Sequence, residues 1–233
     1  ALSTIPLSTA KAMGMTIYNA DVTVGTSGSG NVQTSLAVAD SLWFGDVLVK
    51  NLLFLLVPDE TMSFPQINYT ISGIIGFPVM LAVEEIHLQK EGPLFIPLEP
   101  APRYFSNLCM EGLSPYVQLF SGSDALVFKL DTGARVSELS KRYYDNHREA
   151  VDIAGRDTVT MRGSAAGIQE SREKILTGFP FRIGSAEGVL ADMRVTLEDY
   201  RFTKSADGNL GQDVLTQFDT MILNFQDMFI DFE

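Results

Sequence analysis

The sequence predicts an all-β protein of two similar, barrel-like lobes with a few short helices. Runs of alternating apolar and polar residues recur roughly every 8–12 residues between turn signals, as they do in all-β sandwiches and barrels. The clearest run lies at 126–130, where Leu126, Phe128 and Leu130 alternate with Val127 and Lys129, which is the period of a half-buried strand. The second observation is a weak internal repeat, which indicates that one lobe architecture occurs twice.

The internal repeat pairs short segments of the first half with segments of the second half at offsets of 134–139 residues. Five segments match in the same order along the two halves: 2–5 with 136–139, 22–23 with 159–160, 32–33 with 168–169, 44–45 with 183–184, and 74–76 with 209–211. Each match is weak alone, but the common order and spacing indicate two copies separated by small insertions. We therefore expect an N-terminal lobe at 1–97, a Pro-bearing linker at 98–103 and a C-terminal lobe at 104–233.

The composition of the 233 residues is that of a globular protein, 45% apolar and 20% charged. A net charge of −12 argues against nucleic-acid binding, which requires clustered Lys and Arg. The longest apolar run, 47–58, is interrupted by two polar residues and is too short to span a membrane. Cys109 is the one cysteine and the histidines are His87 and His147. These residues form no metal-ligand set, so we expect no metal and no cofactor.

A candidate catalytic carboxylate, Asp131, follows the strand predicted at 126–130. It opens the sequence Asp-Thr-Gly-Ala, in which Gly133 permits a sharp turn or a close backbone approach. The triplet alone also fits an ordinary structural turn, since Asp and Gly are common turn residues. A second signal, Asn-Leu-Gly at 209–211, ends 80 residues after Asp131.

The chain resembles the pepsin and retropepsin superfamily of aspartic proteases in its apolar strand, Asp131-Thr132-Gly133-Ala134, Ser137 and Leu210-Gly211. The resemblance implies acid-protease-type β-barrel lobes, in which residues 209–211 pass behind the Asp loop in a psi-shaped crossing. It also implies that Asp131 is catalytic, that Thr132 holds two Asp loops in register and that Gly133 lets them approach. Within the resemblance, Ala134 marks the retropepsin-like variant and Ser137 supports the loop, and the chain as a whole resembles the bacterial, two-lobed type. Asn209 departs from the apolar residue that the family has there.

The resemblance assigns two hairpins to flap-like positions, where a mobile hairpin closes over the substrate. Their tips are rich in Gly and Ser and comprise Gly25, Ser27, Gly28 and Gly30 in the first copy and Gly163 and Ser164 in the second. A plain exposed hairpin is the alternative at both places.

The register of the repeat puts the counterpart of Asp131 four residues before Ala1. We therefore expect the first lobe to be incomplete at its N-terminus and a first Asp to lie upstream. From that position to Gly76 the separation is 79 residues, against 80 from Asp131 to Gly211. The alternative is a degenerate first lobe that never carried an Asp. With a single Asp this chain supplies half a site, so we expect little or no activity from it alone.

The resulting hypothesis is an aspartic endopeptidase that hydrolyses peptide bonds with two carboxylates and an activated water, one carboxylate being that of Asp131. Its partner is a peptide or protein substrate, and we expect a two-lobed monomer, with a dimer as the alternative. A non-catalytic peptide-binding module on the same fold is the second hypothesis. The third is an unrelated all-β structural or carbohydrate-binding domain with an accidental motif. The resemblance alone suggests an exported protein, and the cellular location is otherwise open.

Overall fold

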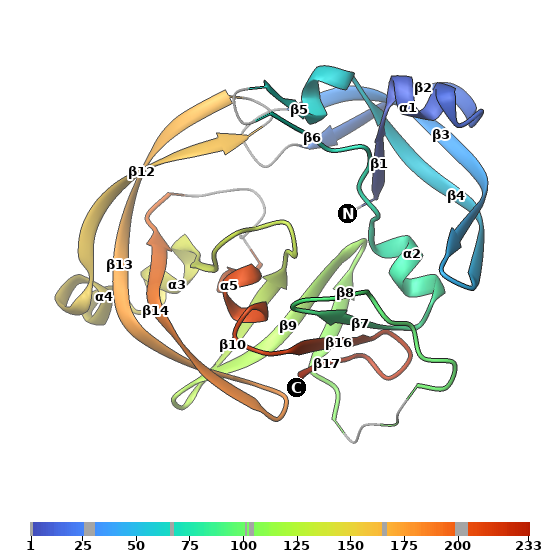
Figure 1. Cartoon of the computed structure of the whole chain (residues 1–233). Helices are drawn as coiled ribbons and strands as arrows, with labels where there is room; N and C mark the ends of the chain where they lie inside the picture. The colour runs from blue at the N-terminus through green and yellow to red at the C-terminus, as the bar shows by residue number, and fades with distance from the viewer. Residues whose placement is uncertain are drawn as a thin grey trace. The chain divides into compact units, whose positions relative to one another are not determined.

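The computed structural model describes residues 2–25, 31–65, 68–100, 102, 105–164, 167–198 and 205–233 (Figure 1). Within these ranges, only the backbone is described for residues 25, 31–32, 161–164 and 167–169. The chain divides into two compact units, Ala1–Val83 (unit 1) and Glu84–Glu233 (unit 2). Strands dominate both units and the helices are short, so the all-β prediction is confirmed.

Unit 1 is built on a four-stranded sheet in the order β1–β4–β3–β2. Strand β1 runs parallel to β4, whereas β2, β3 and β4 form an antiparallel meander. The elements are β1 (Ser3–Pro6), α1 (Leu7–Ala12), β2 (Thr16–Gly25), β3 (Asn31–Phe44), β4 (Val47–Val57), a 3-10 helix η1 (Asp59–Met62), β5 (Ser63–Phe64), β6 (Tyr69–Thr70) and α2 (Phe77–Ala82).

One face of this sheet forms the core of unit 1. Leu52, Phe54 and Leu56 alternate along β4 and are buried, as the period of a half-buried strand requires. They pack in one cluster with Ala10 of α1 and Val79 of α2. The short helices α1 and α2 therefore cover the same apolar side of the sheet.

Unit 2 contains an eight-stranded sheet in the order β12–β13–β14–β11–β15–β10–β9–β8 and a three-stranded sheet in the order β17–β16–β7. Its strands are β7 (Glu85–Gln89), β8 (Leu108–Glu111), β9 (Ser114–Ser121), β10 (Asp124–Leu130), β11 (Glu138–Leu139), β12 (Arg156–Ser164), β13 (Gly167–Ile183), β14 (Ala186–Thr196), β15 (Gly208–Leu210), β16 (Thr220–Asn224) and β17 (Phe229–Phe232). Its helices are α3 (Lys141–Asn146), α4 (Arg148–Ala154) and α5 (Gln212–Leu215).

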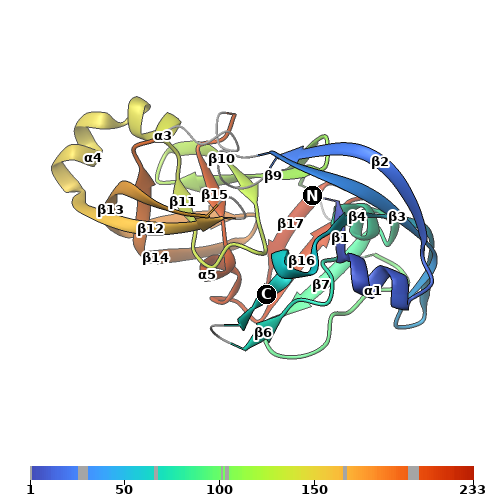
Figure 2. The same ribbon diagram turned by 90° about the horizontal axis from the view of Figure 1, so that it is seen from above.

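The large sheet of unit 2 has one apolar face, which we call the core face. Leu130, Leu139, Val195 and Leu210, which lie on four neighbouring strands, are at most 1% exposed. The register pairs Val195 with Lys174, whose ammonium group lies 3.4 Å from Asp152 Oδ1 on α4. Helix α4 therefore lies on the core side, and Figure 2 shows α3 and α4 together on one face of strands β12–β14.

Strand β15 is threaded between two strands that come much earlier in the chain. It runs parallel to β10, pairing Leu210 with Leu130, and antiparallel to β11, pairing Gly208 with Leu139. A side chain at residue 208 would meet the Glu138 carbonyl oxygen and the Phe128 ring at 2.4 Å, so only glycine fits there. The strand order β11–β15–β10 therefore places β15 between two strands that are far from it in the sequence. We call this arrangement the crossing.

The boundary between the compact units lies between Val83 and Glu84, and β7 pairs antiparallel with β16 inside unit 2. The division into 1–97, 98–103 and 104–233 remains a sequence-based expectation, as does closure of each lobe into a barrel.

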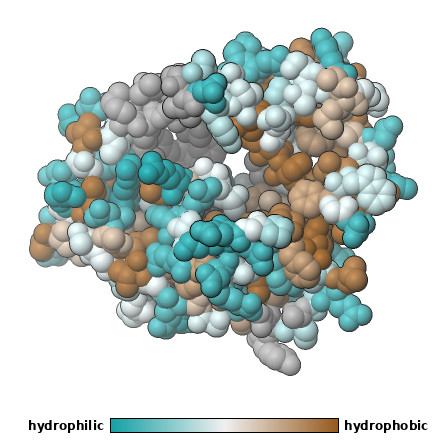
Figure 3. All heavy atoms as spheres, viewed as in Figure 1, coloured by the Kyte–Doolittle hydropathy of each residue, from teal (hydrophilic) through white to brown (hydrophobic). Residues whose placement is uncertain are grey.

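No helix among the described residues is long and apolar enough to cross a membrane. On the face seen in Figure 3, hydrophilic residues cover most of unit 2 among scattered apolar ones.

Candidate functional site

Asp131 stands at the end of β10, and backbone hydrogen bonds fix its position. Its N–H donates to the Leu210 carbonyl at 3.0 Å, continuing the pairing of β10 with β15. Its own carbonyl accepts from the Ala134 N–H at 3.0 Å, which closes the turn 131–134. Leu130, the last residue of the strand, is buried, whereas Asp131 is half-buried, so the turn carries the carboxylate out of the core.

The Asp131 carboxylate lies over its own turn. Oδ1 accepts a hydrogen bond from the Gly133 N–H at 3.0 Å, a local side-chain-to-backbone bond typical of Asp in turns. This bond sets the orientation of the side chain without using the second oxygen. A carboxylate held in this way can accept a further proton or a hydrogen bond from a ligand at Oδ2.

The segment after β15 passes close behind the loop 131–137. A Cβ atom at residue 211 would meet the Val136 carbonyl carbon at 2.7 Å and the Ala134 carbonyl oxygen at 2.9 Å. Gly211 is therefore required by close backbone approach. The next residue, Gln212, ties the two segments together, because its N–H donates to the Ala134 carbonyl at 2.9 Å and its Nε2 donates to the Thr132 carbonyl at 2.8 Å.

A cluster of hydrogen bonds around Ser137 lies beneath the loop and joins it to Gly211 and Asp213. We call this cluster the polar hub. The Ser137 hydroxyl accepts from the Gly211 N–H at 2.9 Å and donates to Asp213 Oδ1 at 2.6 Å. Asp213 also accepts from the Ser137 N–H at 2.9 and 2.8 Å and from the Val214 N–H at 3.0 Å. Ser137 is fully buried, so every polar group of this side chain is used.

The structure brings together most of the residues that the sequence singled out in unit 2. Asp131, Thr132, Gly133 and Ala134 form the turn, and Ser137 contacts Gly211 directly. Leu210 supports the turn through its carbonyl, and its side chain is buried in the core. Their catalytic and supporting roles stay predictions.

The sequence analysis assigned no role in the site to Gln212 or Asp213. Asp213 does accept from the Val214 N–H at the start of α5, but it also holds Ser137. A signal for this was present, because Gln212 and Asp213 directly follow the glycine of the crossing. Any polar side chain at these two positions lies next to the loop.

The flap-like residues fall partly outside the described structure. Ser27, Gly28 and Gly30 lie outside the described residues, and Gly25 ends β2. Gly163 and Ser164 end β12, where the register pairs them with Ile168 and Gly167 of β13. The two hairpins β2–β3 and β12–β13 exist as expected from the sequence, and their role as flaps stays a prediction.

A crossing is also present in unit 1. The Ser3 hydroxyl accepts from the Gly76 N–H at 2.9 Å, and Thr4 and Ile74 exchange backbone hydrogen bonds of 2.9 and 2.8 Å. In unit 2 the hydroxyl of Ser137 holds the Gly211 N–H in the same way.

The groups with shifted pKa in unit 2 have structural causes. Burial raises the pKa of the Tyr143 hydroxyl, and the carboxylates of Asp124 and Asp207 raise it further. Burial likewise raises the pKa of Tyr116. The hydrogen bond with Asp157 raises the pKa of the Lys174 ammonium group, to which Asp152 adds. These shifts follow from packing and ion pairing.

Two further observations on the described residues concern metal ions and a surface hollow. Within the described ranges, no three His, Cys, Asp or Glu side chains are grouped to hold a metal ion. A surface hollow of about 490 Å³ lies at the β13–β14 turn, lined by residues that include Phe120, Phe181 and Arg182. Arg182 lies over the Phe120 ring, with its guanidinium carbon 4.4 Å from the ring centroid, so this stacked pair forms part of the wall of the hollow.

Comparison with known proteins gives a weak structural likeness. No protein-family model matches the sequence, and no curated protein matches it. A retropepsin-like aspartic protease from Rickettsia conorii is similar at 22% identity and a TM-score of 0.35, over 51% of this chain and 86% of that one. The retroviral protease-like domain of Ddi1 from Leishmania major is similar at 19% identity and a TM-score of 0.36, over 56% and 90%. The EIAV protease in complex with the inhibitor HBY-793 is similar at 20% identity and a TM-score of 0.33, over 47% and 93%.

Proposed function

We propose that Asp131 is one of the two catalytic carboxylates of an aspartic endopeptidase. The observation that carries the proposal is the crossing in unit 2, where Gly211 passes behind the loop 131–137 and Ser137 binds both Gly211 and Asp213. This network holds the Asp131 turn from behind and leaves its carboxylate half-exposed. A rigid mount with an open carboxylate is what general acid–base chemistry requires.

The chemistry requires a second carboxylate close to Asp131. Two neighbouring carboxyl groups share one proton, because two like charges at hydrogen-bonding distance cannot both ionise cheaply. The ionised member takes a proton from a water molecule, whose oxygen attacks the peptide carbonyl carbon. The protonated member donates a hydrogen bond, and then its proton, to the carbonyl oxygen, which gives a tetrahedral gem-diol. When this intermediate collapses the C–N bond breaks, the carboxyl group that took the water proton passes it to the leaving amine nitrogen, and a gem-diol hydroxyl returns its proton to the other carboxylate.

The second carboxylate comes, on this proposal, from a second Asp-Thr-Gly loop. The sequence contains this triplet once, so the loop belongs either to another part of the same polypeptide or to a partner chain. The crossing of Ser3 with Gly76 in unit 1 supports the internal repeat. The residues of this chain alone therefore cleave peptides slowly or not at all.

A non-catalytic peptide-binding module is the second candidate function. The single Asp-Thr-Gly in the sequence favours it, because an extended peptide can bind through backbone hydrogen bonds without any carboxylate pair. The two functions differ in one result: a binding module leaves a bound peptide intact.

Because this chain supplies one carboxylate, the test uses the protein together with its second Asp-Thr-Gly loop, in one polypeptide or as an assembled dimer. A mixed peptide library is incubated with this protein, with its Asp131→Asn variant and with an Asp192→Asn control, and the products are identified by mass spectrometry. Asp192 is an exposed carboxylate on β14, so its amide leaves the loop untouched. Cleavage that is lost in Asp131→Asn by a factor of about 10³ or more and retained in Asp192→Asn supports the peptidase. Peptide binding without cleavage supports the binding module. Cleavage that persists in Asp131→Asn contradicts the proposed role of Asp131.

A further inference from the structure

One peptide group links the Asp131 carboxylate to the segment that passes behind the loop. The C=O of Thr132 and the N–H of Gly133 belong to this same group, which is trans. The carbonyl accepts a hydrogen bond from Gln212 Nε2 at 2.8 Å, and the N–H donates to Asp131 Oδ1 at 3.0 Å. A planar trans peptide holds its C=O and N–H in opposite directions. Gln212 and the carboxylate therefore bind the two ends of one rigid group.

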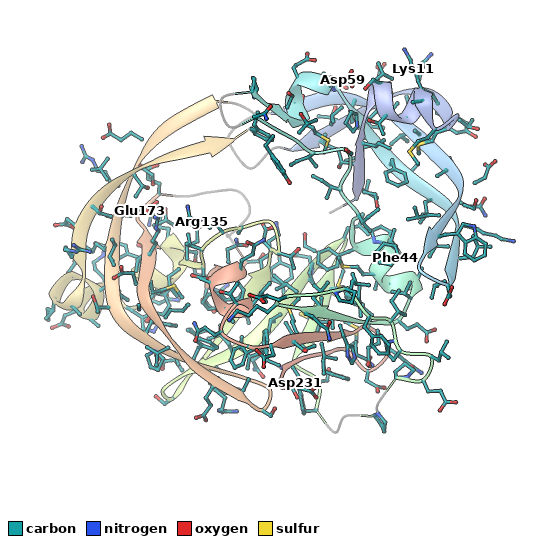
Figure 4. The ribbon with its side chains drawn as sticks, in the orientation of Figure 1. Lys11, Phe44, Asp59, Arg135, Glu173 and Asp231 are labelled. Atoms are coloured by element: carbon teal, nitrogen blue, oxygen red, sulfur yellow. The ribbon has the colours of Figure 1, made fainter. Side chains whose placement is uncertain are left out.

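This peptide is the central one of the turn 131–134, and Figure 4 labels Arg135, which directly follows the turn. The hydrogen bond from the Ala134 N–H to the Asp131 carbonyl closes the turn at 3.0 Å. Turns closed in this way occur as types I and II, which differ by rotation of the central peptide through roughly 180°. Type II requires a positive φ angle at the third residue. The φ angle of Gly133 lies outside the positive range, so the observed turn is not of type II.

Glycine at the third position leaves the type II orientation accessible. A residue with a Cβ atom resists positive φ, whereas glycine adopts it without steric cost. Rotation of the central peptide would turn the Gly133 N–H away from Asp131 Oδ1 and would break the bond between the Thr132 carbonyl and Gln212. The two hydrogen bonds therefore favour the observed orientation together. The bond that the carbonyl accepts also polarises the peptide and strengthens the bond that its N–H donates.

Gln212 reaches this peptide from a fixed position. It is the first residue of α5, and its own N–H donates to the Ala134 carbonyl at 2.9 Å. Its two donors thus bind the carbonyls of Thr132 and Ala134, which lie on either side of Gly133. Gln212 is exposed, in contrast to the buried Ser137. The effect of its side chain on the turn can therefore be separated from an effect on the core.

We infer that Gln212 is the positioning residue of Asp131: by holding the Thr132 carbonyl, it keeps the central peptide in the orientation whose N–H binds the carboxylate. The inference rests on the proposed function where cleavage is concerned, but the orientation of the peptide is a property of this chain alone. Without the Gln212 donor the peptide rotates more often, and the released carboxylate turns about its Cβ–Cγ bond. Poorer orientation of a reacting group slows the chemical step more than it weakens peptide binding.

The first measurement is amide hydrogen exchange of Gly133, followed by NMR on this chain. Gln212→Met keeps the length of the side chain and removes its donor, whereas Gln212→Lys supplies a donor again. The control is Gln217→Met, because Gln217 is also exposed and its Nε2 donates to the Asp213 carbonyl at 3.2 Å instead of to the loop. Urea unfolding of each variant measures the stability of the fold.

We expect the Gly133 amide to exchange about three- to tenfold faster in Gln212→Met, because the net effect of one hydrogen bond changes an opening equilibrium by about that factor. Gln212→Lys and Gln217→Met should exchange within about twofold of the unaltered protein, and all variants should unfold at the same urea concentration. Unchanged exchange in Gln212→Met, an equal increase in Gln217→Met, or no recovery in Gln212→Lys overturns the inference. An increase that Gly133 shares with the amides of the core strands, as global unfolding gives, also overturns it.

The second measurement is cleavage by the protein assembled with its second Asp-Thr-Gly loop, using a peptide of the mixed library that this protein cleaves. Gln212→Met should lower kcat about three- to tenfold with KM within about twofold, whereas Gln217→Met should leave both unchanged. A higher KM at unchanged kcat would mean that Gln212 contacts the substrate, and it would overturn the positioning role. The proposed function is judged separately: cleavage that persists in Asp131→Asn refutes the peptidase, and faster Gly133 exchange in Gln212→Met then still supports the positioning of the Asp131 side chain.

Discussion

Replacing Gly211 with Ala tests the crossing on which the candidate site depends. The added Cβ would lie 2.7 Å from the Val136 carbonyl carbon, 2.8 Å from its oxygen and 2.9 Å from the Ala134 oxygen. All three contacts are with backbone atoms, which cannot rotate away as a flexible side chain would. The φ angle of Gly211 is −111°, so Ala tolerates this backbone conformation and the expected effect is steric.

The magnitude follows from these three overlaps. Overpacking in a tight interior costs about 1–3 kcal/mol, and contact with backbone on two residues favours the upper end, about 3 kcal/mol. Relief of the overlap moves residue 211 away from the loop, which also lengthens its N–H bond to the Ser137 hydroxyl, now 2.9 Å. For a unit of this size, each kcal/mol lowers the melting temperature by roughly 2–4 °C, so we expect a decrease of about 6–12 °C.

The assay is thermal and urea unfolding followed by circular dichroism, with peptide cleavage measured below the transition. Gly73→Ala is the matched control, because a Cβ there meets the Thr4 oxygen at 3.6 Å and the Ile5 side chain at 3.9 Å, which are ordinary contacts. Gly73→Ala should lie within about 1 kcal/mol of the unaltered protein. If Gly211→Ala unfolds at the same midpoint as Gly73→Ala, the close approach inferred for the crossing is wrong.

Two further predictions concern the hub and the buried tyrosine. Ser137→Ala leaves the Gly211 N–H and Asp213 without their hydroxyl partner, so we expect a loss of about 1–3 kcal/mol in urea unfolding; a loss no larger than that of Ser123→Ala, in an exposed turn, would contradict the hub. Burial raises the pKa of Tyr143 above its unfolded value of 10.0, so the unfolded state ionises first and stability falls as pH rises above about 10. Tyr143→Phe should therefore match the unaltered protein at pH 8 and lose less stability at pH 11, and an unchanged alkaline decrease would refute this assignment.

The strands of unit 2 were largely predictable from local pattern, but their lengths were not. The alternation at 126–130 identified β10, which the structure extends to Asp124–Leu130. The region 138–148 reads as one polar helix, yet the structure has β11 at Glu138–Leu139 followed by α3 and α4. The two strand residues carry no local signal, because their strand conformation depends on pairing with β14 and β15, which are distant in sequence.

The candidate site was likewise predictable from the sequence in some residues and not in others. Asp131, Gly133 and Gly211 were identifiable because a strand end, a turn and a close approach each leave a residue type in the sequence. The bond between Asp213 and Ser137 could not be derived from either residue alone, since it joins side chains 76 positions apart.

The turn that presents Asp131 is fixed by bonds that do not depend on the charge of its carboxylate. Its backbone is held by the Leu210 carbonyl in front and by Gln212 and the Ser137 hub behind. The hydrogen bond that the carboxylate receives within the described part of the chain, from the Gly133 N–H to Oδ1 at 3.0 Å, can be accepted equally by the amide oxygen of Asn. An Asp131→Asn protein should therefore keep both its fold and its turn. Any loss of cleavage in that variant then reports the chemistry of the carboxylate, because the position of the loop is unchanged.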